Sequence, residues 1–403
     1  MKRIYLDYAA STPVDPRVLA AMQPYFSEKS GNPGSLHSFG QEAIAAVDAS
    51  RESIARSIGA GFREIIFTGS ATEANNLALR GVVARFREGA DERPRIIISS
   101  VEHESVLETA HDLERDGVEV VYLPVNNAGI VDLKKLKENL TANTVLVSVI
   151  YAQNEVGTVE PIAEMAKMVR EARGAGTYPL LHTDAAQAFQ FLDCDVKALG
   201  VDLMTLSAHK IYGPKGIGAL YIRSDKNLTS LIAPIISGGG QEFGLRSGTE
   251  NVPSIVGFTK AVELAVEVRQ QETKRIQELR NQFLAGLKKI FPDLEINGAA
   301  INGMETNEIE TSVAGENLKN LPNILNVYFP GREAQTLLTK LDLAGLAVSS
   351  GSACRSRALT ASYVIEALGY SKNRAKSSIR FSFGRGTTQE EIVEALRVVK
   401  TAI

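Results

Sequence analysis

The stretch TVLVSVIYAQNEVGTVEPIAEMAKMVREARGAGTYPLLHTDAA, residues 144–186, decides the fold class. It begins and ends with short apolar runs, and a helical pattern closed by glycines lies between them. The apolar residues of the helical pattern share one face: Ile162, Met165, Met168, Val169 and Ala172. A strand, a helix and a second strand in this order predict two parallel strands joined by a crossover helix.

The same alternation continues on both sides of this stretch. Further short apolar runs are EIIFTG (64–69), RIIISS (95–100), VEVVYLPV (118–125), DLMTLSAHK (202–210) and GALYIR (218–223). Apolar strands that alternate with helices indicate an α/β protein with a mainly parallel sheet covered on both faces. Ligands bind at the carboxyl ends of strands in such sheets, so the residues after each run are the first candidates for a site.

Two later segments depart from the alternation. Residues 254–291 show a long helical pattern without proline, which predicts a helix leading into a smaller C-terminal domain. Residues 297–321 are polar and weakly periodic, and we expect them to form a surface loop or an insertion.

The composition excludes several classes of protein. The chain has 403 residues, 44% hydrophobic and 23% charged, with a formal net charge of -3. This charge argues against nucleic acid as the main partner, and no apolar run is long enough to span a bilayer. The two cysteines fit neither a disulfide framework nor a zinc site, so no metal is expected. The first residues lack the apolar core of a secretory signal, and we therefore expect a cytoplasmic enzyme.

One cysteine lies in an unusual setting, SSGSACRSRAL at 349–359. Cys354 follows glycine and serine residues, which favour turns and mobile loops over a buried strand or helix. The neighbouring Arg355 and Arg357 favour the thiolate over the thiol. These neighbours indicate a reactive sulfur on a loop.

Lys210 ends an apolar run and enters a glycine-rich turn, in SAHKIYGPKGIGALYIR at 207–223. Its amine is expected at the ligand-binding edge of the sheet, where it either forms a Schiff base or is one more solvated charge. Ser207 and His209 are donors of the kind that hold a phosphate, and the glycines let the backbone approach closely. These neighbours favour the Schiff base.

A second candidate phosphate site lies in FTGSATEANNLAL, residues 67–79, where a strand, a glycine turn and a helix are predicted. Ala71, Thr72 and Glu73 would lie at the helix N-terminus, where unpaired N–H groups and the helix dipole attract an anion. The alternative is an ordinary N-cap at Ser70 or Thr72.

Three more polar residues follow apolar runs. Asp184 ends one run, and a buried carboxylate needs a cationic partner, either a protonated pyridine nitrogen or a salt bridge. His103 and Asn154 follow two other runs; a histidine can stack on a flat cofactor and exchange protons, and a satisfied core polar group is the alternative for both. Pyridoxal phosphate needs a lysine for an imine, an aspartate for the ring nitrogen, a stacking histidine and a phosphate site. These residues together therefore predict this cofactor.

Motifs spread over nearly the whole chain occur in a fixed order: YLDYAASTPVDP, GNPGSLHSFGQ, GSATEANN, EHESV, NEVGTVEPI, HTDAAQ, SAHKIYGPKGIGALY, GGGQEFGLRSGTENVP, SSGSACRS and SSIRFSFGRGTT. With these motifs in this order, the chain resembles the cysteine desulfurases of the NifS/IscS family. Those proteins are class V aminotransferase-like, fold-type I pyridoxal phosphate enzymes. This resemblance implies a mainly parallel seven-stranded sheet in a large cofactor-binding domain, 15–258. A smaller α+β domain, 1–14 and 259–403, would carry the mobile catalytic cysteine loop, about 346–362.

The resemblance assigns roles around the cofactor ring. Lys210 would form the Schiff base and later move a proton, and His103 would stack on the pyridine ring. Asp184 would pair with the ring nitrogen and keep it protonated. Asn154 and Gln187 would lie near the phenolic oxygen of the cofactor or near the substrate.

The resemblance also concerns the phosphate, the substrate and a partner subunit. The expected phosphate-binding residues are Ala71, Thr72, Ser207 and His209. Thr249, in RSGTE, resembles a threonine that reaches the phosphate in the neighbouring subunit, which implies a homodimer. Arg380, in SSIRFS, matches an arginine that grips the substrate α-carboxylate, a task suited to its forked guanidinium.

L-cysteine is the substrate that the resemblance implies. Cys354 would attack the substrate sulfur, giving L-alanine and a persulfide that passes to an iron–sulfur scaffold or a sulfurtransferase. Lys210 and His103 are the other expected catalytic residues. Cys194, in FLDCDVKALG, matches no catalytic position, and we interpret it as a structural thiol.

Other functions stay open. A selenocysteine lyase could share every motif, whereas another class V aminotransferase-like enzyme would keep the lysine and the aspartate without needing Cys354 on a loop. A catalytically silent scaffold subunit of the same fold would lose at least one of Lys210, Asp184 and Cys354, and all three are present.

Overall fold

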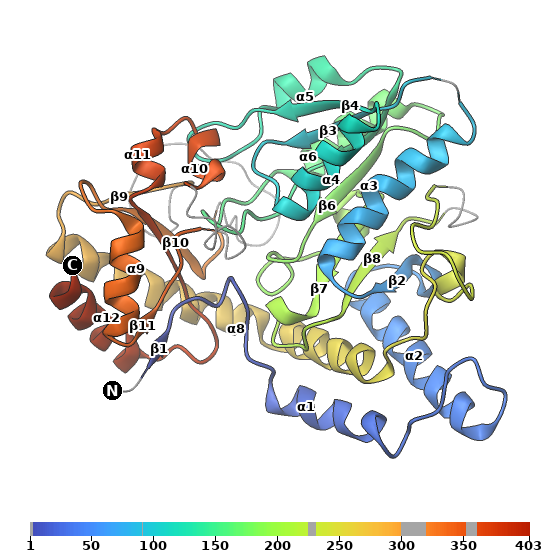
Figure 1. Cartoon of the computed structure of the whole chain (residues 1–403), viewed down its shortest axis with the longest axis horizontal. Helices are drawn as coiled ribbons and strands as arrows, with labels where there is room; N and C mark the ends of the chain where they lie inside the picture. Colours follow the sequence, from blue (N-terminus) through green and yellow to red (C-terminus); the bar gives the residue numbers. More distant parts are fainter. Residues whose placement is uncertain (1–2, 91, 225–230, 300–319, 352–360) are drawn as a thin grey trace.

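The chain forms a large sheet and a smaller second unit, and one long helix connects them (Figure 1). The computed structural model describes residues 3–90, 92–224, 231–299, 320–351 and 361–403. Residues 352–360 of the predicted cysteine loop, which include Cys354, and most of the predicted polar insertion therefore lie outside the described residues.

The large sheet has seven strands in the order β2-β8-β7-β6-β5-β3-β4. These are β2 (Ile65–Thr68), β3 (Arg95–Ser99), β4 (Glu119–Leu123), β5 (Thr144–Ser148), β6 (Leu180–Asp184), β7 (Leu203–Ser207) and β8 (Gly218–Ile222). β8 runs antiparallel to both of its neighbours, and the other neighbouring strands are parallel. Each of the seven apolar runs forms one strand, so the predicted mainly parallel sheet is confirmed.

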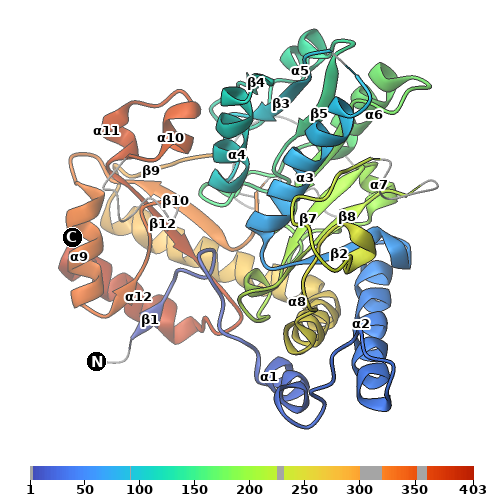
Figure 2. The same ribbon diagram turned by 45° about the vertical axis from the view of Figure 1, so that its right-hand side comes forward.

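Helices cover both faces of this sheet (Figure 2). The helices of the large sheet are α1 (Pro16–Met22), α2 (Ser38–Ser57), α3 (Ala71–Arg87), α4 (Glu104–Arg115), α5 (Leu133–Asn139), α6 (Ile162–Arg173), α7 (Val196–Leu199) and α8 (Val252–Ile290). α3 and α4 pack on one face, whereas α2, α6 and the first half of α8 pack on the other. Both faces are buried, which explains why the strands lack a polar side. On α6, Ala172 departs from the prediction because it lies exposed in the last turn.

The second unit contains both ends of the chain (Figure 1, left). Its elements are β1 (Ile4–Tyr5), β9 (Glu295–Ile296), β10 (Ile324–Tyr328), β11 (Leu346–Ala347), β12 (Ser378–Ser382), α9 (Ala334–Leu343), α10 (Tyr363–Ala367), α11 (Lys372–Ala375) and α12 (Gln389–Ala402). β12, β10 and β9 form an antiparallel sheet, and β1 pairs in parallel with β11. A separate hydrophobic cluster fills this unit and joins residues from both chain ends, including Leu6 and Phe381.

α8 is one continuous helix of 39 residues, close to the predicted 254–291. Its buried residues up to Ala265 belong to the core of the large sheet, and those from Ile276 onward belong to the second cluster. The change of core therefore falls inside the helix. The division into a domain at 15–258 and a second domain from the remaining residues stays a prediction.

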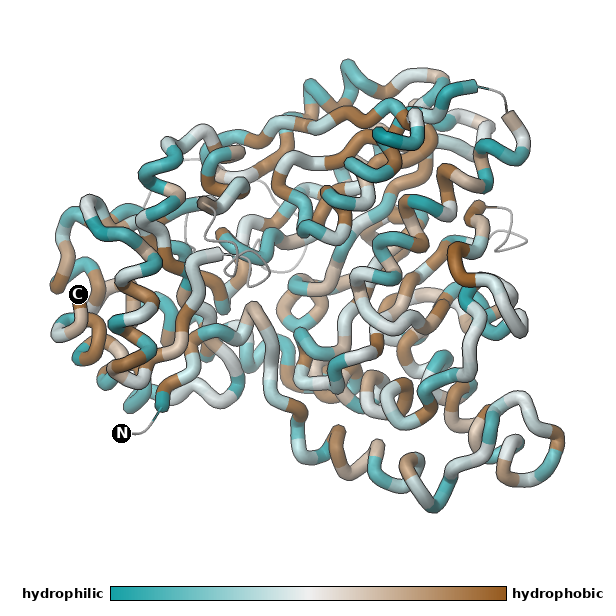
Figure 3. Tube along the Cα trace, viewed as in Figure 1, coloured by the Kyte–Doolittle hydropathy of each residue, from teal (hydrophilic) through white to brown (hydrophobic). Residues whose placement is uncertain are grey.

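Hydrophobic residues follow the strands and the inward sides of the helices, and hydrophilic residues dominate the outer turns (Figure 3). This distribution is what a sheet covered on both faces requires. Within the parts of the chain that the structure describes, no helix is both long enough and apolar enough to cross a membrane.

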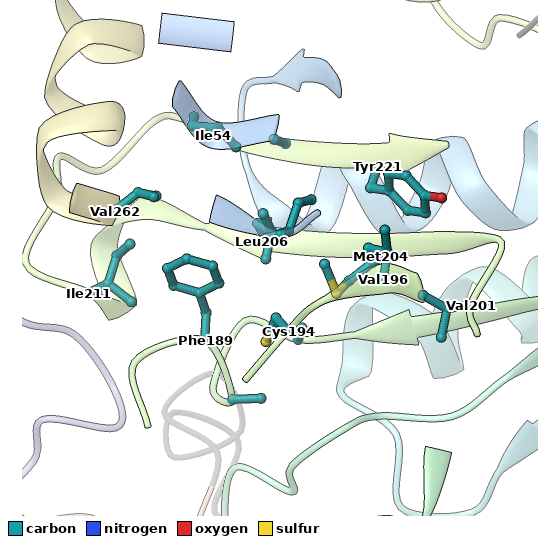
Figure 4. Packing of buried hydrophobic residues seen from close by; sticks show 14 of the residues in the cluster. Ile54, Phe189, Cys194, Val196, Val201, Met204, Leu206, Ile211, Tyr221 and Val262 are labelled. Atoms are coloured by element: carbon teal, nitrogen blue, oxygen red, sulfur yellow. The ribbon is translucent and has the colours of Figure 1, made fainter. Parts of the chain in front are cut away.

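Cys194 lies inside the core of the large sheet (Figure 4). Its side chain is 0% exposed, in the cluster that also contains Phe189, Val196 and Met204. Burial raises the pKa of this thiol to about 12. Both properties agree with the interpretation as a structural thiol.

We expect Cys194→Ala to lower the free energy of unfolding by about 1 kcal/mol, a usual cost for a small buried truncation. Turnover should stay near the wild-type value. Because the thiol is buried and protonated at neutral pH, iodoacetamide should label it only after unfolding. Chemical denaturation and peptide mass spectrometry test both points, and fast labelling of the folded protein would contradict them.

Candidate active site

Four of the predicted site residues lie at one edge of the large sheet, where the carboxyl ends of its parallel strands meet. Asp184 is the last residue of β6. Lys210 ends a short 3-10 helix, η3 (Ala208–Lys210), that directly follows β7. His103 is the N-cap of α4, just after β3, and Asn154 follows β5. These four residues therefore lie where the strand-end rule predicts a ligand site, and their roles stay predictions.

A chain of hydrogen bonds joins Asp184 to His103. Asn75 on α3 donates from Nδ2 to Asp184 Oδ2 at 2.7 Å and to Ser105 Oγ at 2.8 Å. Ser105 Oγ lies 2.8 Å from His103 Nδ1, and the Ser105 N–H donates to the same nitrogen at 3.1 Å. The carboxylate and the imidazole are therefore held by one buried network.

This network determines the tautomer of His103. Because Nδ1 accepts the backbone N–H of Ser105, the proton of the neutral ring is on Nε2. Burial lowers the pKa of His103 below its usual value; Asp184 raises this pKa and Lys210 lowers it. The ring is therefore neutral at neutral pH and carries its exchangeable proton on Nε2.

Lys210 and Gln187 share a backbone acceptor. Lys210 Nζ donates to the carbonyl oxygens of Ala9 at 2.7 Å and Ala10 at 2.9 Å, and Gln187 Nε2 donates to Ala9 at 2.8 Å. The segment that follows β1 thus crosses the site edge and holds both side chains. Sequence reasoning placed Lys210 and Gln187 at the site but did not predict this crossing segment.

The expected phosphate-binding residues lie around the start of α3 and the end of β7. Ser207 ends β7 opposite Gly218, and Gly218 also pairs with Thr68 at the end of β2. A Cβ on Gly218 would lie 2.7 Å from the Ser70 backbone and 2.8 Å from Ala71 N. Only glycine therefore lets β8 begin directly beside the helix N-terminus.

The N-terminus of α3 is capped and still open to an anion. Ser70 Oγ accepts the Glu73 N–H at 3.1 Å, which makes Ser70 the cap that one prediction named. Ala71 is partly exposed and Thr72 is exposed in this first turn. His209 Nδ1 lies 3.3 Å from a serine hydroxyl, and burial is the main cause that lowers its pKa to about 4. A phosphate here would meet helix N–H groups and a neutral histidine.

Arg380 brings the second unit to the site. It lies on β12 and is 1% exposed. Its Nη1 donates to the Asn154 carbonyl at 2.8 Å, and its Nη2 lies 2.9 Å from Asp7 Oδ1. Among the described residues its Nε has no hydrogen-bond partner. The two residues predicted to bind the substrate therefore touch each other.

Two predicted residues are not joined to this group. Thr249 is exposed in the loop before α8. Cys354 lies outside the described residues, in the gap between residues 351 and 361. Their roles stay predictions.

Asn75, Ser105 and the Ala9 carbonyl bond the candidate site residues, and sequence reasoning missed all three. Asn75 had a signal, because it is a polar residue at a position where the period of the helix requires burial. Ser105 lies within the EHESV motif but was not singled out. A backbone carbonyl leaves no trace in a pattern of side chains.

The model of the aminotransferase class-V family matches residues 4–396. The chain belongs to the aminotransferase class-V family. Among its class-V relatives, the cysteine desulfurase IscS of Dictyoglomus turgidum is 43% identical over 405 residues, covering 100% of this chain and 95% of the relative. The mitosomal cysteine desulfurase of Trachipleistophora hominis is 44% identical over 403 residues, covering 100% of this chain and 86% of the relative.

Similar solved structures agree with the fold. A NifS-like protein has a TM-score of 0.86 and 36% identity, covering 99% of this chain and 98% of that one. The structure of SspA in complex with cysteine has a TM-score of 0.77 and 35% identity, covering 94% of this chain and 98% of that one. The predicted family and fold class are thereby confirmed.

This class-V family uses pyridoxal phosphate, and the charges of the site fit that cofactor. Asp184 is 4% exposed, and in the described parts of the chain its hydrogen-bond donors are neutral, namely the Asn75 side chain and the Ala186 N–H. The predicted alternative, a salt bridge, is not found among the described residues. A protonated pyridine nitrogen would supply the missing cation.

Proposed function

We propose that the chain is a cysteine desulfurase, which takes sulfur from L-cysteine and leaves L-alanine. One observation carries the proposal. The two backbones pair here: the backbone N–H of Arg380 donates to the Ser349 carbonyl at 2.6 Å, and the backbone N–H of Ser349 donates to the Arg380 carbonyl at 3.2 Å. The segment that contains Cys354 thus begins beside the arginine proposed to bind the substrate. The relatives named as cysteine desulfurases support the same activity.

Bound pyridoxal phosphate would supply an electron sink for the bonds at the substrate α-carbon. Lys210 would hold the cofactor and move a proton at Nζ, while Asp184 would keep the ring nitrogen protonated. His103, neutral and oriented by Ser105, would stack on the ring. The phosphate would be bound by Ala71, Thr72, Ser207 and His209.

Substrate binding and sulfur transfer fall to residues of both units. Arg380 would bind the α-carboxylate through its guanidinium, with Asn154 and Gln187 beside the substrate. The thiolate of Cys354 would attack the substrate sulfur, so that an S–S bond forms and the C–S bond breaks. The persulfide on Cys354 would then pass to a protein acceptor in the cytoplasm, an iron–sulfur scaffold or a sulfurtransferase.

Treatment with L-cysteine tests this activity directly. Mass spectrometry should find added sulfur on the Cys354 peptide and none on the Cys194 peptide, with alanine released. Borohydride reduction should fix the cofactor on the Lys210 peptide. Alanine release without sulfur on Cys354 would contradict the proposal and indicate a plain lyase or aminotransferase.

A selenocysteine lyase is the alternative that uses the same residues. The values of kcat/KM for L-cysteine and L-selenocysteine separate the two activities. A large preference for selenocysteine would favour the lyase. A silent scaffold subunit fits poorly, because Lys210 and Asp184 lie together at the site edge with their hydrogen bonds made.

We infer a homodimer in which Thr249 reaches the cofactor phosphate of the neighbouring subunit. Large apolar side chains are exposed near the start of the chain: Leu19, Phe26, Leu36 and Phe39. α8, which begins three residues after Thr249, contacts α1 and the short helix η1 (Gln23–Phe26), and its Gly257 lies against Met22 of α1. The start of α8 therefore lies beside α1 and η1, which carry Leu19 and Phe26. Light scattering should report twice 43.5 kDa, and a fully active monomer would contradict the dimer.

We expect Asn75→Ala to lower turnover about 10- to 100-fold, a usual loss when a residue that orients a catalytic group is removed. The change removes the donor shared by Asp184 and Ser105, so the carboxylate and His103 lose their common support. Steady-state alanine formation measures the loss. Asn76→Ala is the matched control, because Asn76 is partly exposed and bonds only Thr72 and Arg80 among the described residues. Equal losses in both variants would contradict this role.

A further inference from the structure

Glu155 is a buried carboxylate that the proposed reaction does not use. It directly follows Asn154 and is 1% exposed. Its N–H donates to Gln153 Oε1 at 2.5 Å, and its carbonyl accepts from Asn326 Nδ2 on β10 at 3.1 Å. The backbone of Glu155 is therefore fixed to the large sheet and to the second unit, which gives its carboxylate a defined place.

One oxygen of this carboxylate lies against both flanks of the segment that contains Cys354. Ser362 Oγ, on the downstream flank, donates to Glu155 Oε2 at 2.6 Å. Gly351, on the upstream flank, has φ +151°, and a Cβ there would lie 2.8 Å from the same Oε2. A side chain at this position would therefore be strained and would collide with the carboxylate.

Further contacts tie these flanks to the site residues. Ser362 is the N-cap of α10, where its Oγ accepts the Ile365 N–H at 3.2 Å. The hydroxyl of the next residue, Tyr363, donates to the carbonyl of Glu102, which directly precedes His103. On the upstream side, Ser349 pairs with the backbone of Arg380. The two flanks that lie against Glu155 are thus tied to the residue before His103 and to Arg380.

We propose that Glu155 is a positioning residue for sulfur transfer. It holds Ser362 by a hydrogen bond and packs against Gly351, so that the two flanks of the segment bearing Cys354 keep fixed places beside Asn154 and Arg380. The inference rests on the proposed desulfurase activity. Neither cofactor binding nor substrate binding is assigned to Glu155, so its loss should leave both nearly unchanged. It should slow the step that depends on the flanks, which is the attack of the Cys354 thiolate on the substrate sulfur. Misplacement of a reacting group by about 1 Å can cost about 100-fold in rate.

Single-turnover persulfide formation on Cys354 tests this inference in the cofactor-loaded protein. Glu155→Ala and Ser362→Ala should each lower this rate about 10- to 100-fold, with cofactor absorbance and the KM for L-cysteine near their wild-type values. The double variant should be no slower than the slower single variant, because the two side chains act as a pair. Glu155→Gln keeps an acceptor for Ser362 and should recover most of the rate.

Glu160→Ala is the matched control. Glu160 is also buried and lies in the same loop, but its Oε2 accepts the Val131 N–H, away from both flanks. This variant should lose stability and keep the wild-type rate of persulfide formation. If Glu155→Ala does not fold, the other two variants decide the question. Persulfide formation should be slow in Ser362→Ala and close to the wild-type rate in Glu155→Gln.

The two proposals fail in different ways. A wild-type protein that forms no persulfide on Cys354 overturns the desulfurase activity itself. A wild-type protein that forms the persulfide, while Glu155→Ala and Ser362→Ala match its rate, overturns only the positioning role. A loss of rate that merely follows a loss of bound cofactor would also overturn the positioning role.

Discussion

Cys354→Ala should stop the release of alanine from L-cysteine while the cofactor stays bound. We expect turnover to fall roughly 10³-fold or more, because the variant has no thiolate to attack the substrate sulfur. Lys210, Asp184 and Arg380 keep their positions, so the protein should stay yellow and its spectrum should still change on addition of L-cysteine. Amino-acid analysis of released alanine and absorbance spectra measure the two halves of this result.

Cys194→Ala is the natural control for that experiment, since it removes the other cysteine of the chain from a buried site. It should release alanine at nearly the wild-type rate. If Cys354→Ala releases alanine as fast as the wild type, the persulfide mechanism is wrong. The chain would then be a lyase or an aminotransferase that does not need the cysteine.

Lys210→Ala is expected to have an effect of similar size. The variant loses the amine that would hold the cofactor and move a proton at the substrate carbon, so turnover should fall roughly 10³-fold or more. The Ala9 and Ala10 carbonyl oxygens, which accept from Nζ, would be left without this donor. Alanine assays and borohydride reduction of the loaded protein measure the loss, and no peptide should then retain the cofactor.

Lys215→Ala provides the comparison, because Lys215 is exposed in the same glycine-rich turn. Its removal should leave both cofactor attachment and turnover near wild type. Cofactor attached to Lys215, or to any other lysine, would defeat the assignment of Lys210.

Much of the large sheet could be predicted because its physical cause is local. A strand buried on both faces needs a continuous apolar run, and each of the seven runs met that need. The strand-end residues followed from the same argument, since Asp184 and Lys210 directly continue two of the runs. The long helix was visible for a related reason, a helical period that no proline interrupts.

The rest of the site depends on contacts between distant parts of the chain. Asn75 meets Asp184 only because α3 and β6 lie together in the folded sheet, and no spacing rule connects them. Likewise, the carbonyl of Ala9 accepts from Lys210 and Gln187 because β1 pairs with the far end of the chain. Side-chain patterns carry no information about either event, so only the structure could reveal them.

The pairing of β1 with β11 has a consequence for synthesis. Ile4 and Tyr5 leave the ribosome long before their partners Leu346 and Ala347. The Leu6 carbonyl must likewise wait for the N–H of Ser382. The nascent chain can therefore build the large sheet before β11 and β12 are made, whereas the acceptors for Lys210 reach their place only after these strands, which would keep the protein inactive until then.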